Sequence, residues 1–419
     1  MIRNNLFDMR KSRKQNKAFF ILFAFVILIT GGLEYNHWNA TYGGWANKLI
    51  YYGLLIYMVY MTFSTVKDRQ YDFKNQVLLL MLLPFFSIIN SSLEYSQSIG
   101  KSFSVLLSQF VWVIYFLLHK YKIREDTILK VFLCVALLIV AIQVIQQFTY
   151  PNAPFGTKSE SEMLALGVTE AAEQRNGLWR FRMHQNAFYT APILFFLWLK
   201  VRNKLNFLWV CIVALLFVSV YLTLTRQILV ACILAIFLSM FMGKKKMNFT
   251  ALFIGLLLIV GLYVFYDVLF SSLAEQTQNE ADDDNVRLLA ASVLWSESIK
   301  TPLTFLFGYG LPAGTSDYAL HMQQLQSFFG IYTSDVGFVG QIFERGFLYV
   351  CVCYYMLYKV FFKMKGSIPL YIRMFVVFTG AMSIMIFPCI IPAQNIVWVM
   401  LLYICDLHIK KSPLAMETY

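Results

Sequence analysis

The sequence predicts an all-α polytopic integral membrane protein with about twelve transmembrane helices. Apolar residues make up 59% of the 419 residues and charged residues only 14%, and most of the chain consists of apolar runs joined by short connections. Soluble domains are about 45–50% apolar and about 25% charged. This composition excludes a soluble fold, and we interpret residues 1–419 as a single membrane domain.

The first apolar run, 18–29, follows a basic stretch and is not succeeded by a small-x-small cleavage site. We therefore interpret it as a retained span and not as a signal peptide. The expected spans are 18–29, 46–63, 76–90, 102–118, 128–148, 187–199, 205–222, 227–242, 249–269, 346–362, 372–388 and 393–407.

Clusters of lysine and arginine occur at every second connection, for example at 120–124, 200–204 and 244–246. By the positive-inside rule these connections and both termini are predicted to be cytoplasmic. The two long connections, 149–185 and 271–345, then become large extracytoplasmic loops. The net charge of +12 is explained by this topology, so we expect no nucleic-acid partner.

Neither a disulfide framework nor a metal site is indicated. The seven cysteines lie in apolar runs without CxxC spacing, which is typical of small core residues. The three aspartates at 282–284 could hold a metal–diphosphate complex. A solvated acidic start of the helix that contains Arg287 is the simpler interpretation. We expect no metal and no cofactor.

The sequence of the second long loop predicts amphipathic helices. One apolar pattern at helical spacing begins at Arg287 and ends at Thr301-Pro302, which is a helix stop signal. A glycine turn, 308–310, follows it. A second amphipathic segment starts at 333–335 and ends at Gly346.

Arginines on the predicted outer face are candidate ligands for an anion. Arg226 stands at the outer end of an otherwise uncharged helix, while Arg180 and Arg182 precede a span. A guanidinium binds phosphate through two parallel hydrogen bonds. Two plainer explanations remain open: Arg226 could anchor its helix by snorkelling, and Arg180 and Arg182 could contact lipid headgroups.

Four short patterns occur in sequence order on this face: Arg180-x-Arg182-x-x-x-Asn186 before a span, Thr225-Arg226 heading an apolar helix, Arg287…Trp295…Pro302…Gly308-Tyr309-Gly310, and Ser334-Asp335-Val336-Gly337…Glu344-Arg345-Gly346. Together they resemble the O-antigen polymerase and ligase superfamily, which comprises Wzy-type polysaccharide polymerases and their ligase relatives. The resemblance covers residues 175–362 and the overall pattern of spans.

The resemblance implies metal-independent glycosyl transfer at the outer leaflet of a bacterial inner membrane. The substrate would be an undecaprenyl-diphosphate-linked oligosaccharide, whose repeat units are joined into an O-antigen, capsule or exopolysaccharide chain. The expected partners are this lipid-linked substrate, the growing glycan chain and the lipid bilayer. Candidate protein partners are a chain-length regulator and a flippase.

The resemblance also implies residue roles. Arg226 and Arg287 would neutralise the departing diphosphate in place of a metal. The general base that activates the acceptor hydroxyl would be Asp335 or His321. Asp335 could instead be a plain helix N-cap, and His321 a polar loop residue. The residues expected to bind substrate are Arg180, Arg182, Asn186, Gly308 and Gly310.

Three other classes of protein remain as alternatives. Ligases of the superfamily have a histidine near the segment where this chain has Ser334-Asp335, so the sequence favours a polymerase. A lipid-linked oligosaccharide flippase should carry charges inside its bundle and repeated halves, and the chain shows neither pattern. A non-catalytic membrane scaffold would leave the outward arginines unexplained.

Overall fold

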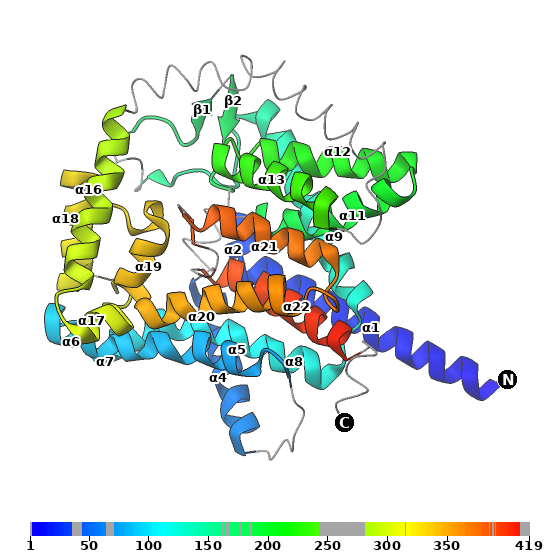
Figure 1. Cartoon of the computed structure of the whole chain (residues 1–419). Coiled ribbons are helices and arrows are strands. Elements are labelled where there is room, and N and C mark those ends of the chain that lie inside the picture. Colours follow the sequence, from blue (N-terminus) through cyan, green and yellow to red (C-terminus); the bar gives the residue numbers. More distant parts are fainter. Residues whose placement is uncertain are drawn as a thin grey trace.

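The computed structural model describes residues 2–35, 44–63, 71–160, 163, 168–175, 177–183, 187–242, 281–314, 316–384, 386–387, 389 and 391–410. This part of the chain is predominantly helical (Figure 1). A two-stranded sheet, β1 (Glu173–Arg175) and β2 (Leu178–Arg180), departs from the all-α prediction.

The first half of the chain contains α1 (Ile2–Ile29), α2 (Gly31–Glu34), α4 (Gly44–Phe63), α5 (Lys74–Leu82), η2 (Leu83–Phe86), α6 (Ser87–Tyr95), α7 (Ile99–Leu106), η3 (Leu107–Val113), α8 (Ile114–Tyr121) and α9 (Glu125–Thr149). The second half contains α11 (Ala187–Asn203), α12 (Phe207–Tyr221), α13 (Arg226–Met242), α16 (Ala281–Ser298), α17 (Pro302–Phe307), α18 (Asp317–Phe329), η5 (Thr333–Asp335), α19 (Gly337–Arg345), α20 (Phe347–Tyr358), η6 (Lys359–Lys363), α21 (Leu370–Met382) and α22 (Pro392–Ile409).

Among the described residues, four helical stretches are long and apolar enough to cross a membrane: Lys74–Tyr95, Ile99–Tyr121, Glu125–Thr149 and Pro392–Ile409. Shorter apolar helices are Phe207–Tyr221, Arg226–Met242 and Leu370–Met382. These helices support a multi-pass membrane protein. The number of spans stays a prediction, and the expected span 249–269 lies outside the described residues.

Helix α22 lies in the interior of the bundle. Every residue from Ala393 to Asp406 is buried, and the helix contacts α1, α8, η3 and α11. It therefore faces other helices along its whole length. This setting explains why α22 can carry Asn395 and Asp406, because polar side chains in apolar helices normally face the interior of a bundle.

Helices α16 to α19 form a separate small module at one end of the bundle (Figure 1). Its own core includes Leu294, Tyr309, Tyr318 and Phe343. The start of α1 and the end of α22 lie at the opposite side of the molecule in Figure 1. Helices α16 and α19 lie where the sequence predicts helices, but Leu288, Leu289 and Trp295 of the predicted apolar face of α16 are exposed.

The sequence pattern predicts only a helix stop at Thr301-Pro302, whereas in the structure α17 starts there. The Thr301 hydroxyl accepts a hydrogen bond from the Thr304 amide, and the Thr304 hydroxyl in turn accepts from the Thr301 amide. This capping box, with proline at the first helical position, favours a new helix start. Helix α18 was also not predicted.

The Gly308–Gly310 turn packs against the end of α19. The Tyr309 amide donates to the Phe343 carbonyl and the Gly310 amide to the Glu344 carbonyl, both at 2.7 Å. A Cβ atom on Gly308 would lie 2.6 Å from the backbone nitrogen of Arg345, and the φ angle of Gly308 is +70°. Only glycine permits this approach of two backbones.

We expect Gly308→Ala to lower the free energy of unfolding by about 3 kcal/mol or more, because the new methyl group meets backbone atoms that cannot move aside and the φ angle is unfavourable for alanine. Thermal unfolding of the purified protein in detergent measures this change.

Gly314→Ala is the matched control. Gly314 also has a positive φ, +55°, but open space surrounds its Cβ position. We expect it to cost only about 1 kcal/mol, for the backbone conformation alone. Equal effects of the two substitutions would contradict the close packing of the turn against α19.

Candidate functional site

Two consecutive glutamines at the end of α9 hold the loop 149–185 in place. The Gln147 amide group donates to the Trp179 carbonyl (2.7 Å) and accepts from the Trp179 amide (2.9 Å). Gln146 binds the backbone of Phe155 in the same two-bond manner, at 3.1 and 2.8 Å. Trp179 also stacks on Tyr150, with ring centroids 3.9 Å apart. These contacts hold strand β2 against the end of α9.

The hairpin β1–β2 pairs a carboxylate with two arginines. The strand register sets Glu173 directly opposite Arg180, and Glu173 forms ion pairs with Arg180 (3.1 Å) and Arg175 (2.8 Å). Burial by itself would raise the pKa of Glu173, but hydrogen bonds and charge from Arg175 and Arg180 outweigh it and lower the pKa. The glutamate is therefore ionised at neutral pH.

Both arginines reach the segment that precedes α13. Arg180 Nη2 lies 3.5 Å from the Thr225 hydroxyl, and Arg175 Nη1 lies 3.5 Å from the Leu224 carbonyl. Arg226 begins α13 directly after these contacts and is half-buried. The structure therefore brings the predicted residues Arg180 and Arg226 into one region, which we call the arginine cluster: Arg175, Arg180 and Arg226 with Glu173.

Asp335 extends this region from a distant part of the chain. Burial and the charge of Arg175 lower the pKa of Arg180, while the carboxylates of Glu173 and Asp335 oppose the shift. The interpretation of Asp335 as a helix N-cap is wrong: Asp335 lies in the 3₁₀ turn η5, and Val336 precedes α19 without a side-chain cap. The Asp335 carboxylate is exposed and accepts from the Ser334 hydroxyl at 2.9 Å.

Arg287 lies on α16, which contacts η5 and α19. Its side chain is exposed. The preceding residue, Val286, packs against Gly330, where a Cβ atom would lie 3.3 Å from it. Arg287 is therefore carried by the helix that covers the turn with Asp335, although no direct contact joins its side chain to the arginine cluster among the interactions that the structure gives for the described residues.

The alternative prediction that His321 is a polar loop residue is wrong, because His321 lies on α18. Its half-buried ring stacks on Tyr95 at 5.4 Å between centroids. Tyr95 also stacks on Tyr318. Within the described residues, these aromatic contacts join α18 to α6, and none joins His321 to the arginine cluster.

Arg182 continues the chain after β2 and is exposed. Its amide donates to the Gly156 carbonyl at 2.5 Å, while the Gly156 amide donates to the Glu34 carbonyl at 2.8 Å. Burial raises the pKa of Glu34 to about 8, and the charge of Arg182 opposes this rise. The predicted ligand Asn186 lies outside the described residues.

The predicted ligands Gly308 and Gly310 lie in the backbone packing against α19 described above. Beside them, the buried Glu344 accepts from the Thr333 hydroxyl at 2.5 Å. Burial raises the pKa of Glu344, against the opposing effects of Thr333, Arg345 and Gln341. The buried Arg345 faces Gln109, whose oxygen, with the amide turned toward the guanidinium, accepts at 2.6 and 3.1 Å.

Sequence reasoning missed Glu173, Gln147 and Glu34. A signal for Glu173 was present, because the alternation Glu-x-Arg places both side chains on one face of a strand and Asn-Gly at 176–177 is a hairpin turn dipeptide. No local pattern distinguishes Gln147 from other glutamines at a helix end. Its role depends on a backbone 32 residues away.

In the described part of the chain, no three histidine, cysteine, aspartate or glutamate side chains are grouped so that they could hold a metal ion. The side chains of the aspartates at 282–284 are not described. No protein-family model matches the chain, and no curated protein is similar to it in sequence.

We expect Gln147→Ala to free the hairpin from α9, because the amide and carbonyl of Trp179 lose both partners. The cost is about 2 kcal/mol for two hydrogen bonds. Hydrogen exchange of the Trp179 amide, followed by mass spectrometry, should accelerate. Gln174→Ala is the control, since Gln174 is exposed in the same hairpin, and unchanged exchange in both variants would contradict the clamp.

Proposed function

We propose that the chain is a glycosyltransferase of the inner bacterial membrane that polymerises undecaprenyl-diphosphate-linked oligosaccharide units at the outer leaflet. One observation carries this proposal: Arg180 contacts the Thr225 hydroxyl directly before Arg226, and the charge of Asp335, from a third distant segment, acts on Arg180. Arginines that bind an anion and a carboxylate that accepts a proton are the groups which such a transfer requires.

The charge balance of this region favours an anionic ligand. Arg175, Arg180 and Arg226 provide three positive charges, and Glu173 and Asp335 provide two negative ones. Arginines held close together repel each other, so Glu173 lowers the cost of gathering them without cancelling their charge. A diphosphate placed against the arginines would gain charge-assisted hydrogen bonds of about 1.5–3 kcal/mol each.

In the proposed reaction an acceptor hydroxyl attacks the anomeric carbon of the lipid-linked glycan. The new carbon–oxygen bond forms as the bond to the diphosphate breaks, and the electron pair leaves on the diphosphate oxygen. The arginines stabilise this developing charge. Asp335, whose exposed carboxylate acts on the charge of Arg180, takes the hydroxyl proton. We favour it over His321, whose ring is engaged in the aromatic stack on Tyr95.

A cavity of about 590 Å³ lies between α4, α7 and the loop that follows Gly310. Its lining includes Lys48, Asn47, Lys101 and Ser104. Amides, hydroxyls and ammonium groups donate hydrogen bonds to sugar hydroxyls and to phosphate. We assign to this cavity the binding of part of the lipid-linked glycan.

The proposed topology places loops 149–185 and 271–345 outside the cytoplasm and both termini inside. We expect a cysteine at Ser327, on α18, to be labelled by an impermeant maleimide on intact cells. A cysteine at Lys365 should be labelled only after permeabilisation. Both positions are exposed, so accessibility differs only by the side of the membrane. Labelling of Ser327→Cys from the cytoplasmic side alone would contradict the topology and the proposed reaction.

We expect Arg180→Lys and Arg226→Lys to lower polymerisation of purified lipid-linked substrate on the order of a hundredfold, while membrane expression stays near normal. Lysine preserves the charge but not the planar fork of the guanidinium. Arg202→Lys is the control. Arg202 lies at the end of α11 and donates to the Ser239 carbonyl, near the end of α13 that is remote from Arg226. EDTA should leave the rate unchanged.

The same assay separates the two candidate bases and the alternative functions. Asp335→Asn should abolish turnover, and His321→Phe, which keeps the ring stack, should retain it; the reverse result assigns the base to His321. Cells without the protein should still export and attach single repeat units. Accumulation of single units on the inner leaflet would indicate a flippase, and failure to attach any unit to the acceptor would indicate a ligase.

A further inference from the structure

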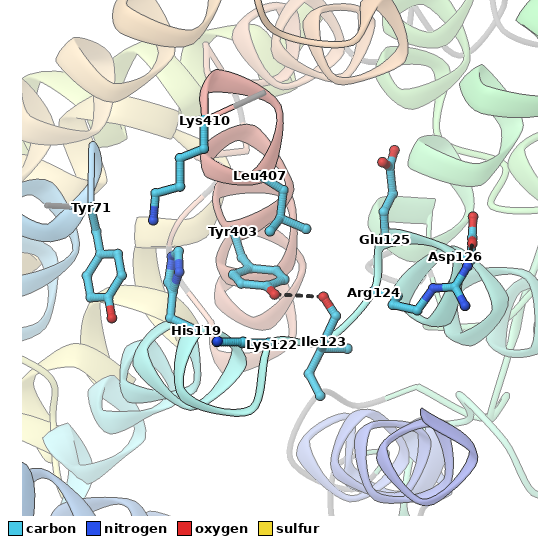
Figure 2. Close-up of a pocket in the computed structure, with 10 residues that line it drawn as sticks. All are labelled: Tyr71, His119, Lys122, Ile123, Arg124, Glu125, Asp126, Tyr403, Leu407 and Lys410. Atoms are coloured by element: carbon cyan, nitrogen blue, oxygen red, sulfur yellow. Dashed lines mark hydrogen bonds and ion pairs between the residues drawn. The ribbon is translucent and has the colours of Figure 1, made fainter. Parts of the chain in front are cut away.

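A second cavity lies at the end of the bundle where α8 and α22 end and α9 begins (Figure 2). Its volume is about 530 Å³, within the range of about 300–1,000 Å³ that is usual for pockets holding small organic ligands. It lies at the start of α9, whereas Gln147 near the other end of α9 holds the hairpin of the arginine cluster. Its lining residues take no part in the proposed glycosyl transfer. The lining consists of Tyr71, His119, Lys122, Ile123, Arg124, Glu125, Asp126, Tyr403, Leu407 and Lys410.

The two carboxylates of the lining already have partners of their own. Asp126 pairs with Arg124 at 2.9 Å. Glu125 accepts from the Tyr371 hydroxyl at 3.0 Å and lies 2.8 Å from His408 Nε2. Both carboxylates are therefore engaged by neighbouring side chains other than Lys122 and Lys410.

The two lysines of the lining are in a different situation. Among the described residues neither Lys122 nor Lys410 forms an ion pair within 4.0 Å. The Lys410 ammonium lies 5.0 Å above the ring of Tyr71. The charges of Lys410 and of Lys359 both act on the Asp72 carboxylate, and Lys359 also donates to the Asp72 backbone carbonyl. Figure 2 shows Lys410 directed toward Tyr71 and His119.

The backbone of Lys122 supports a role for its side chain. Lys122 follows α8 with φ +50° and ψ +55°, in the left-handed region. Glycine is the usual residue at such a helix end, and lysine is unfavourable there. A lysine at this position keeps a positive charge at the cavity at the expense of local stability.

The residues that line the cavity include buried polar groups as well as apolar ones. His119 is buried and its Nε2 lies 2.9 Å from the buried Asp406 carboxylate, which also accepts from Tyr115. The Tyr403 hydroxyl donates to the Ile123 carbonyl at 2.6 Å. Tyrosine rings beside lysines are typical of the boundary between headgroups and acyl chains.

From this geometry we propose that the cavity binds a phosphate group, namely the phosphodiester of an anionic membrane lipid, through Lys122 and Lys410. Basic pockets between membrane helices suit anionic headgroups because ammonium groups act as point charges toward phosphate. Leu407 and the tyrosines would contact the glycerol and the start of the acyl chains. On the proposed topology the lipid belongs to the inner leaflet.

The test measures lipid binding to the purified full chain in detergent, by native mass spectrometry and by thermal unfolding. Phosphatidylglycerol should bind and raise the unfolding temperature, and phosphatidylcholine with the same acyl chains should not. In the double variant Lys122→Gly with Lys410→Gln, binding of phosphatidylglycerol should weaken about thirtyfold. sn-Glycerol 3-phosphate, added separately, distinguishes a lipid from a soluble phosphate.

The substitution to glycine separates loss of the site from loss of the fold. Lys122→Gly relieves the left-handed backbone, so the lipid-free unfolding temperature should be unchanged or higher. Ser96→Gly is its control, because Ser96 ends α6 with φ +50° and is remote from the cavity. Lys363→Gln is the control for Lys410, since Lys363 also lies over a tyrosine ring, 5.4 Å from that of Tyr355.

Equal binding of the two lipids by the wild type would overturn the proposal. So would a double variant that responds to phosphatidylglycerol like the wild type. If glycerol phosphate protects as strongly as the lipid, and this protection also depends on Lys122 and Lys410, the phosphate site is supported and its ligand is soluble.

Discussion

Side-chain amides at or near the ends of helices hold the long loops of this protein in place. Gln146 and Gln147 bind the backbone of Phe155 and Trp179. Asn90 donates to the carbonyls of Leu303 and Gly308. The buried Gln97 donates to the Leu311 carbonyl and accepts from the Ala313 amide and the Ser316 hydroxyl. A loop without regular structure must find partners for its backbone groups, and a carboxamide offers both a donor and an acceptor.

This arrangement determines what the arginines can do. Gln147 holds the backbone of Trp179 in place. The side chain of the neighbouring Arg180 is therefore positioned next to the Thr225 hydroxyl. The strand register then sets Glu173 against Arg180. An arginine fork that is positioned before the ligand arrives loses less conformational entropy on binding. The geometry is therefore better suited to recognition of a charged group than to anchoring in headgroups, which needs only a flexible side chain.

The positively charged side chains of the two proposed sites differ in type. The arginine cluster contains guanidinium groups, whose planar forks match the paired oxygens of a diphosphate. The cavity at the other end contains Lys122 and Lys410, whose compact ammonium groups act as point charges and tolerate a mobile headgroup. Under the proposed function, the guanidinium groups would bind a lipid diphosphate and the ammonium groups a membrane phospholipid.

The sequence alone is enough to predict a helical chain with several long apolar helices, and helices at the positions of α16 and α19. These features follow from local composition and from periodicity, which neighbouring residues carry. It also identified Arg180, Arg226 and Asp335 as candidates. The contact of Arg180 with the turn before Arg226, the position of Asp335 outside the helix cap and the stacking of His321 on Tyr95 could be known only from the folded chain. Glu173 and Gln147 acquire their roles only when strand pairing and helix packing bring distant segments into contact, and a local pattern carries no information about such contacts.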